Sequence, residues 1–144
     1  MRIFSFKSDN ITSMDKKKFS IRVGSLVVFI FIVNYLAMKF YWYSSIWWFD
    51  MPMHFLGGLW LGLAFIWLLW GKEFGWKLIL KIILGILLIG ILWEIFEVVL
   101  NNYTLKLPFN ALDTLSDIFF DLAGGTFAVF YFLKRTMFQR KNKV

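Results

Sequence analysis

The chain of 144 residues contains no cysteine, two prolines, one histidine and few charges, with 16 Lys and Arg and 9 Asp and Glu. The absence of cysteine excludes a disulfide scaffold. So few charges exclude the solvated surface that a soluble enzyme of this size needs, and so little polar sequence excludes a disordered chain. Apolar residues dominate instead, because 60% of the chain is hydrophobic, 22% is aromatic and the mean hydropathy is +0.67.

Four apolar runs follow one another along the chain, each near or above the roughly 20 residues that a helix needs to cross a bilayer. We therefore predict an all-α, polytopic membrane protein whose four transmembrane helices form one bundle. The predicted spans are residues 21–41, 50–70, 76–100 and 110–134. The predicted domains are a basic, mobile or surface-lying N-terminal arm (1–20), the transmembrane domain (21–134) and a basic tail (135–144).

The positive charges are placed as topology signals and not as a nucleic-acid surface, although the net charge is +7. Fourteen of the 16 Lys and Arg residues lie before or at the first span, around the second connection, or after the last span. The positive-inside rule then places both termini and the second connection in the cytoplasm. The basic tail can also bind anionic lipid, and the aromatic outer connections suit the membrane interface.

The acidic residues form spaced groups inside the predicted spans. Six of the nine lie there, at intervals of three or four residues that put side chains on one helix face. All three groups lie toward the outer ends of their spans, so they can meet in the outer half of the bilayer. The groups are Asp50 with His54, Glu94 with Glu97, and Asp113 with Asp117 and Asp121.

Small residues continue two of these groups along their helices. Gly58 and Gly62, in GxxxG spacing, continue the first group, and Gly125 continues the third. Small residues let membrane helices approach each other closely. We therefore expect the second, third and fourth spans to pack around one acidic pocket, which Asp113, Gly58 and Gly125 help to line.

An ionisable side chain at membrane depth costs several kcal/mol unless it is paired, protonated or hydrated. The cations expected on the outer side, Lys39 and Lys106, are too few for six carboxylates. Protons on some carboxyl groups or a bound cation must supply the rest. Carboxylates with one imidazole suit Mg²⁺, Mn²⁺, Fe²⁺ or Zn²⁺. We expect a divalent metal ion as cofactor, held by His54, Glu94, Asp117 and Asp121.

Each of these residues also has a structural interpretation. Asp50 and Asp113 stand where helices begin, so they can equally be N-caps. His54 taken alone is more typical of an interfacial hydrogen-bonding residue, and Glu97 can be a group near the membrane surface. Asn34, in the first span, is interpreted as a residue that holds helices together through its amide.

Three segments carry a resemblance to a known family: DMPMHFLGG at 50–58, WEIFE at 93–97 and DTLSDIFFDLAGG at 113–125. They resemble the YjdF-like bacterial inner-membrane family, itself distantly similar to the VanZ-like proteins. The resemblance covers the second to fourth spans. It implies a multi-pass protein of the bacterial cytoplasmic membrane and, by analogy alone, a role in the cell envelope.

The function that these features favour is a metal-dependent hydrolase or transferase that acts on a lipid or lipid-linked cell-envelope substrate from the outer face. The metal ion would polarise a phosphoryl or carbonyl group, and Glu97 or Asp50 would be the catalytic residue that moves protons. No cysteine and no G-x-S-x-G motif offers a nucleophile. The alternatives are a proton- or cation-coupled transporter, for which a homo-oligomer could supply more helices, and a non-catalytic accessory protein.

Overall fold

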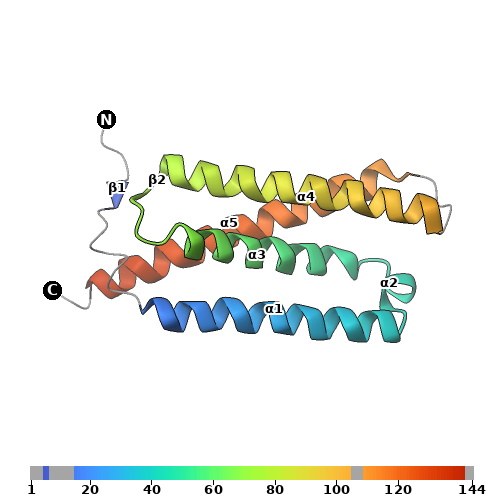
Figure 1. Ribbon diagram of the computed structural model, residues 1–144, viewed down its shortest axis with the longest axis horizontal. Coiled ribbons are helices and arrows are strands. Elements are labelled where there is room, and N and C mark those ends of the chain that lie inside the picture. Colours follow the sequence, from blue (N-terminus) through green and yellow to red (C-terminus); the bar gives the residue numbers. More distant parts are fainter. Residues whose placement is uncertain (1–4, 7–14, 105–108, 142–144) are drawn as a thin grey trace.

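The computed structural model describes residues 5–6, 15–104 and 109–141. Four long helices run along one another and dominate the described part of the chain (Figure 1). A short helix follows the first of them, and two strands of two residues pair antiparallel. The elements are β1 (Ser5–Phe6), α1 (Lys16–Lys39), α2 (Trp42–Ser45), α3 (Asp50–Leu68), β2 (Phe74–Gly75), α4 (Trp76–Thr104) and α5 (Ala111–Lys141).

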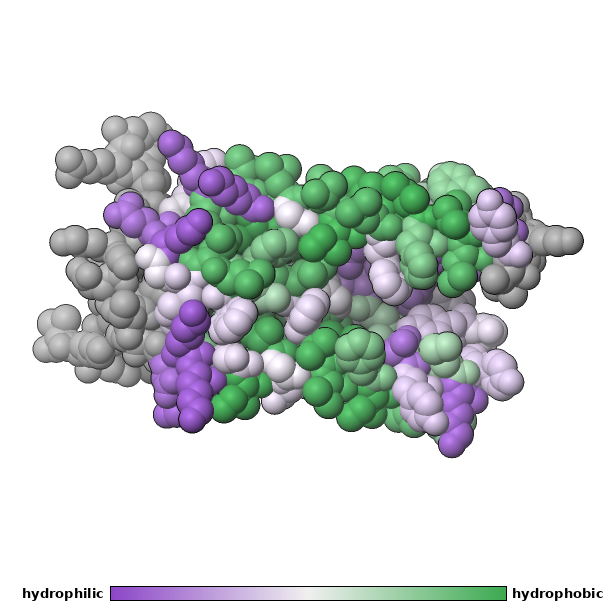
Figure 2. Space-filling view, in the orientation of Figure 1, coloured by the Kyte–Doolittle hydropathy of each residue, from purple (hydrophilic) through white to green (hydrophobic). Residues whose placement is uncertain are grey.

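The four long helices are each long and apolar enough to cross a membrane, with span hydropathies of 2.0 for α1, 1.5 for α3, 2.5 for α4 and 1.3 for α5. Their outward faces carry large apolar side chains, such as Phe31, Leu88 and Phe130. Figure 2 shows the resulting apolar middle with hydrophilic residues gathered toward the two ends. The predicted all-α, four-helix membrane architecture is confirmed.

The two ends of the bundle differ, and we name them by what they carry. The terminal end holds the start of α1 and α4 and the end of α3 and α5, so both ends of the described chain lie there (Figure 1). The far end holds α2, the end of α4 and the start of α5. At the terminal end, β1 of the predicted arm pairs with β2, with Ser5 opposite Gly75 and Phe6 opposite Phe74.

Three helices extend beyond the predicted spans, and α5 does so by continuing to Lys141 past the predicted end at residue 134. α1 begins five residues before the predicted span, because the Asp15 carboxylate accepts hydrogen bonds from the backbone N–H groups of Lys17 (3.0 Å) and Lys18 (3.3 Å). Asp15 is therefore a helix cap as well as a solvated charge. α4 continues to Thr104, past the predicted end at residue 100.

The buried face of each inner helix is a stripe with a spacing of about four residues. Toward the terminal end these stripes are apolar, apart from buried Thr136 near the end of α5, and toward the far end they become polar. The apolar core and the acidic groups therefore occupy different halves of the bundle. A four-residue spacing winds slowly around a helix of 3.6 residues per turn, which suits the diagonal course of α5 in Figure 1. The stripes are His54, Gly58, Gly62 and Ile66 on α3; Leu78, Ile82, Ile86, Gly90 and Glu94 on α4; and Asp117, Asp121, Gly125, Ala128 and Phe132 on α5.

Glycines bring α3 and α5 into backbone contact, as the GxxxG spacing predicts. A Cβ atom on Gly58 would collide with the backbone carbonyl of Asp121, and one on Gly124 would collide with the carbonyl of Phe55. α1 packs less closely against α3, and the Trp60 indole of α3 donates a hydrogen bond to the backbone carbonyl of Val23 in α1 (3.2 Å). The close α3–α5 contact therefore fixes the depth at which their acidic residues meet.

A methyl group at Gly58 should separate α3 from α5. We expect Gly58→Ala to lower the free energy of unfolding by about 1–3 kcal/mol, as over-packing does. Gly24→Ala is the matched control, because nothing lies within 4 Å of a Cβ atom there; it should be neutral or stabilise α1 by up to about 1 kcal/mol. Thermal unfolding in detergent, followed by circular dichroism, measures both. Equal effects of the two substitutions would contradict the close contact.

Candidate metal centre

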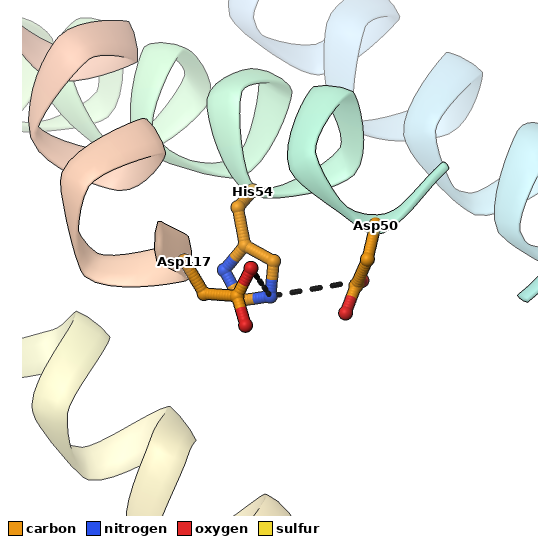
Figure 3. A group of neighbouring side chains, drawn as sticks. All are labelled: Asp50, His54 and Asp117. Carbon is orange, nitrogen blue, oxygen red and sulfur yellow. Dashed lines mark ion pairs between the residues drawn. The ribbon is translucent and has the colours of Figure 1, made fainter. Parts of the chain in front are cut away.

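His54 lies at the centre of the predicted pocket, on the buried face of α3. Its Nε2 atom is 3.7 Å from Asp50 Oδ1 and 3.9 Å from Asp117 Oδ1 (Figure 3). The same nitrogen is 4.0 Å from Glu94 Oε1. On the other side of the ring, Nδ1 is 3.5 Å from Asp121 Oδ1. One imidazole therefore faces four carboxylates.

These carboxylates reach His54 from three helices, so the predicted convergence is observed. Asp50 stands one turn before His54 on α3, Glu94 comes from α4, and Asp117 and Asp121 come from α5. Apart from Asp50, the members of this cluster are all less than 9% exposed. Whether they act as metal ligands stays a prediction.

Asp121 is wedged between α3 and α4. Its Oδ2 atom would lie 2.8 Å from a Cβ atom on Gly90, and its Oδ1 atom 3.8 Å from one on Gly57. Only the missing side chain at Gly90 leaves room for this carboxylate. Sequence reasoning overlooked Gly90, although its position four residues before Glu94 puts it on the same helix face.

Glu94 contains a buried oxygen atom that lacks a hydrogen bond. The side chain is 6% exposed, and its Oε1 atom has no hydrogen-bond partner among the described residues. Leaving such a group unsatisfied costs on the order of 1–3 kcal/mol, and more when the group is charged. The oxygen lies in the cluster, 4.0 Å from His54 Nε2, where a donor or a cation would satisfy it.

The other predicted residues lie around this cluster. Half-buried Glu97 forms a group with His54 and Glu94 in which one potential ligand atom from each lies within 4.8 Å of the others. Asp50, His54 and Asp117 form a second group under the same criterion. Asp113 is exposed and belongs to neither group.

The N-cap interpretation of Asp50 and Asp113 is wrong. The residue that precedes α3 is Phe49, and Asp50 is the first residue of the helix. In α5 the cap is Asn110, whose Oδ1 atom accepts a hydrogen bond from the Asp113 N–H at 3.5 Å. Asp113 lies in the first turn, where a negative charge is favourable next to the helix N-terminus.

Within the described residues, no lysine or arginine forms an ion pair with the cluster. Lys39, one of the two cations expected nearby, lies over the ring of Phe40 at 5.9 Å. The other, Lys106, lies outside the described residues. Even a protonated His54 would supply a single positive charge against four carboxyl groups, so the others need protons or a bound cation.

Tyr43 of α2 lies near the pocket at the far end. Its hydroxyl donates a hydrogen bond to Asn34 Oδ1 (2.7 Å), so the Asn34 amide connects α1 to α2. Its ring packs edge-on against Phe49 at 5.2 Å. Burial, with the negative charges of Asp50 and Glu97, raises the pKa of Tyr43 to about 12. The phenol therefore stays a hydrogen-bond donor at neutral pH.

A protein-family model described as a predicted membrane protein (DUF2238) matches residues 13–137. The chain belongs to this family. The matched region of this DUF2238 protein contains all four long helices' membrane-spanning parts and every residue of the pocket. No curated protein and no solved structure matches the chain.

The contact between His54 and Asp117 can be measured by a double-mutant cycle. With chelator present, we expect His54→Gln and Asp117→Asn to be coupled by about 0.5–3 kcal/mol in the free energy of unfolding, as for groups in direct contact. The control cycle pairs His54→Gln with Asp113→Asn, since Asp113 is exposed and outside the cluster. It should be additive within about 0.5 kcal/mol. Equal coupling in the two cycles would contradict the described contacts.

Proposed function

We propose that this DUF2238 protein binds a divalent cation between α3, α4 and α5 and uses it as an enzyme on a lipid or lipid-linked substrate. One observation carries the proposal. The buried Nε2 atom of His54 faces carboxylate oxygens from three helices at 3.7–4.0 Å, and one of them, Glu94 Oε1, lacks a hydrogen-bond partner within the described structure. A cation would satisfy that oxygen and offset the charge of the cluster.

The spacing of these atoms supports a metal ion. With metal–ligand bonds of about 2.1 Å, neighbouring ligand atoms lie about 3.0 Å apart in octahedral and about 3.4 Å apart in tetrahedral geometry. The observed separations from Nε2 exceed these values by about 0.3–1.0 Å. Rotation of the carboxyl groups of Asp50, Asp117 and Glu94 can supply that movement. One imidazole among oxygens suits Mg²⁺, Mn²⁺, Fe²⁺ or Zn²⁺.

The two ring nitrogens of the imidazole suggest different roles for the acids that they face. Asp50 and Asp117 share the Nε2 side with Glu94, so we assign them with His54 as ligands. Asp121 instead faces Nδ1, where a carboxylate fixes the tautomer and orientation of a metal-binding histidine. This assignment differs from the one expected from the sequence, which made Asp121 a ligand and Asp50 a proton carrier.

A metal ion in this place would polarise a phosphoryl or carbonyl oxygen. Glu97, next to the cluster, is the acid best placed to transfer a proton, since it is half-buried and lies one turn beyond Glu94 toward the far end. The glycine contacts of α3 with α5 hold the ligand-bearing turns at fixed depth, which keeps the acids in register.

The lipid substrate follows from where the cluster lies. It occupies the far half of a bundle whose outward faces are apolar, so a substrate would reach it from the bilayer or from the far surface. The positive-inside rule orients that surface outward with both termini inside, and the YjdF-like and VanZ-like resemblance suggests an envelope substrate in the bacterial inner membrane.

A transporter is less well supported. A carrier needs a polar path from the acidic cluster to the terminal end. The buried stripes below Asp121 are apolar instead, through Ile86 and Ile82 on α4 and Ala128 and Phe132 on α5. An accessory role without catalysis should survive the loss of single carboxylates, whereas the metal-dependent function should not.

Removing the metal should destabilise the protein, and it should also remove any loss of stability caused by Asp117→Asn. Chelation should lower the melting temperature of the wild type, because like charges then lie close together at low dielectric. Asp117→Asn should reduce metal content, yet without metal it should be no less stable than the wild type, because an amide carries no charge. Elemental analysis and thermal unfolding in detergent, each with and without chelator, measure both effects.

Asp113→Asn is the matched control for this experiment, because it removes an exposed carboxylate from the same helix. Its metal content and its response to chelator should equal those of the wild type. An Asp117→Asn protein that loses the same stability with and without chelator would show that Asp117 is structural and would count against the metal centre.

Asp121 should affect the affinity for the metal ion without being a ligand. We expect Asp121→Asn to weaken metal affinity about 10- to 100-fold, as the loss of a histidine-orienting group does. With Co²⁺ as the probe, the visible absorption spectrum of Asp121→Asn should keep the wild-type bands, whereas that of Asp50→Asn should differ. Gly90→Ala, which crowds Asp121 Oδ2 without changing any charge, should also weaken affinity. A Co²⁺ spectrum that changes equally in Asp121→Asn and Asp50→Asn would make Asp121 a ligand.

A further inference from the structure

We propose a second site at the terminal end, where Arg22 of α1 and Arg135 of α5 bind the phosphate of an anionic phospholipid next to the Tyr131 hydroxyl. This site lies at the opposite end of the bundle from the acidic cluster, and it does not depend on the function proposed for that cluster.

Two guanidinium groups meet at one hydroxyl. Arg22 Nη1 donates a hydrogen bond to the Tyr131 hydroxyl at 3.1 Å, and Arg135 Nη1 donates to the same oxygen at 3.0 Å. The two nitrogens are therefore at most about 6 Å apart. A hydroxyl can accept both hydrogen bonds, but it is neutral and leaves both positive charges in place.

Within the described residues, neither arginine is paired with a carboxylate. Of the two described acids at this end, Asp15 pairs with Lys18 at 3.8 Å, and Glu73 is exposed and forms no ion pair with either arginine. Two like charges at this separation repel each other where solvent screening is incomplete. An anion between them would turn the repulsion into attraction.

Arg135 also has an unused donor. Its Nε atom is buried and finds no hydrogen-bond acceptor within the described structure. Guanidinium groups bind phosphate through pairs of parallel N–H groups, and Nε–H belongs to one such pair. A phosphate oxygen is the acceptor that this donor lacks.

The level of the site in the bundle indicates that the phosphate belongs to a lipid. Phe132, next to Tyr131, packs edge-on against Phe19 near the start of α1 (6.1 Å) and Trp70 just after α3 (6.2 Å), so the site lies where helices leave the membrane. Arg22 is exposed although its guanidinium reaches Tyr131 of α5, so the site is open to molecules around the bundle. Basic pockets between transmembrane helices at this depth suit lipid head groups.

The proposal predicts selective stabilisation by an anionic lipid. The full-length protein in neutral detergent is titrated with phosphatidylglycerol, with phosphatidylcholine and with inorganic phosphate, and its melting temperature is followed. Phosphatidylglycerol should raise the melting temperature, and the other two should raise it far less. Arg22→Gln and Arg135→Gln should each shift the phosphatidylglycerol midpoint to about tenfold higher lipid, as expected for the loss of a charged hydrogen bond.

Lys134→Gln is the matched control, because this exposed neighbour of Arg135 carries the same charge; its midpoint should equal that of the wild type. Tyr131→Phe keeps both arginines and should shift the midpoint in the same direction by less, so it tests the site even if an arginine variant fails to fold. Equal shifts in Lys134→Gln and the arginine variants, or a wild type that does not distinguish the two lipids, would overturn the proposal. Stabilisation by inorganic phosphate alone would assign the site to free phosphate instead.

Discussion

The structure depends on one buried contact, in which the His54 imidazole is enclosed by carboxylates from three helices. At membrane depth these charges cannot rely on water for compensation. They are tolerable only if α3, α4 and α5 keep them at distances that a shared proton, hydrogen bond or cation can serve. The observed separations of 3.5–4.0 Å are close to those distances, and rotation of the carboxyl groups can supply the remaining movement. Keeping the acidic residues this close requires close helix contacts, and small residues at those contacts make them possible.

One half of the bundle contains the apolar core that stabilises it, and the other half contains the acidic cluster. Toward the terminal end, Ile82, Ile86 and Phe132 are fully or almost fully buried in an apolar core. That core offsets the free-energy cost of bringing carboxyl groups together in the far half. The close contact of Gly58 with the Asp121 backbone holds α3 and α5 in a fixed relation there. Among the residues that the structure describes, the carboxyl cluster at one end has no lysine or arginine partner, and Arg22 and Arg135 at the other end have no carboxylate partner. Each arrangement suits an ion of opposite sign.

The length of the apolar runs predicted the fold, and the spacing of the acidic residues predicted their convergence, because both follow from helix geometry. Residues three and four apart share a face, so Glu94, Asp117 and His54 could be placed in one pocket from their numbers. Which imidazole nitrogen each acid faces depends on side-chain rotation and helix packing, which spacing does not encode. The contact of Arg22 with Tyr131 joins residues 109 positions apart, and no local pattern marks it. The capping residues also needed the structure, because Asp113 and Asn110 are both good candidates by type.

The central claim is that one cation binds at Nε2 of His54, and anomalous diffraction tests it most directly. Crystals of the full-length protein grown with Mn²⁺ would be measured at the manganese absorption edge. The account predicts one strong anomalous peak at about 2.0–2.6 Å from His54 Nε2 and from oxygens of Asp50 and Asp117. A well-ordered pocket with no peak, or a peak held by other residues away from His54, would contradict it.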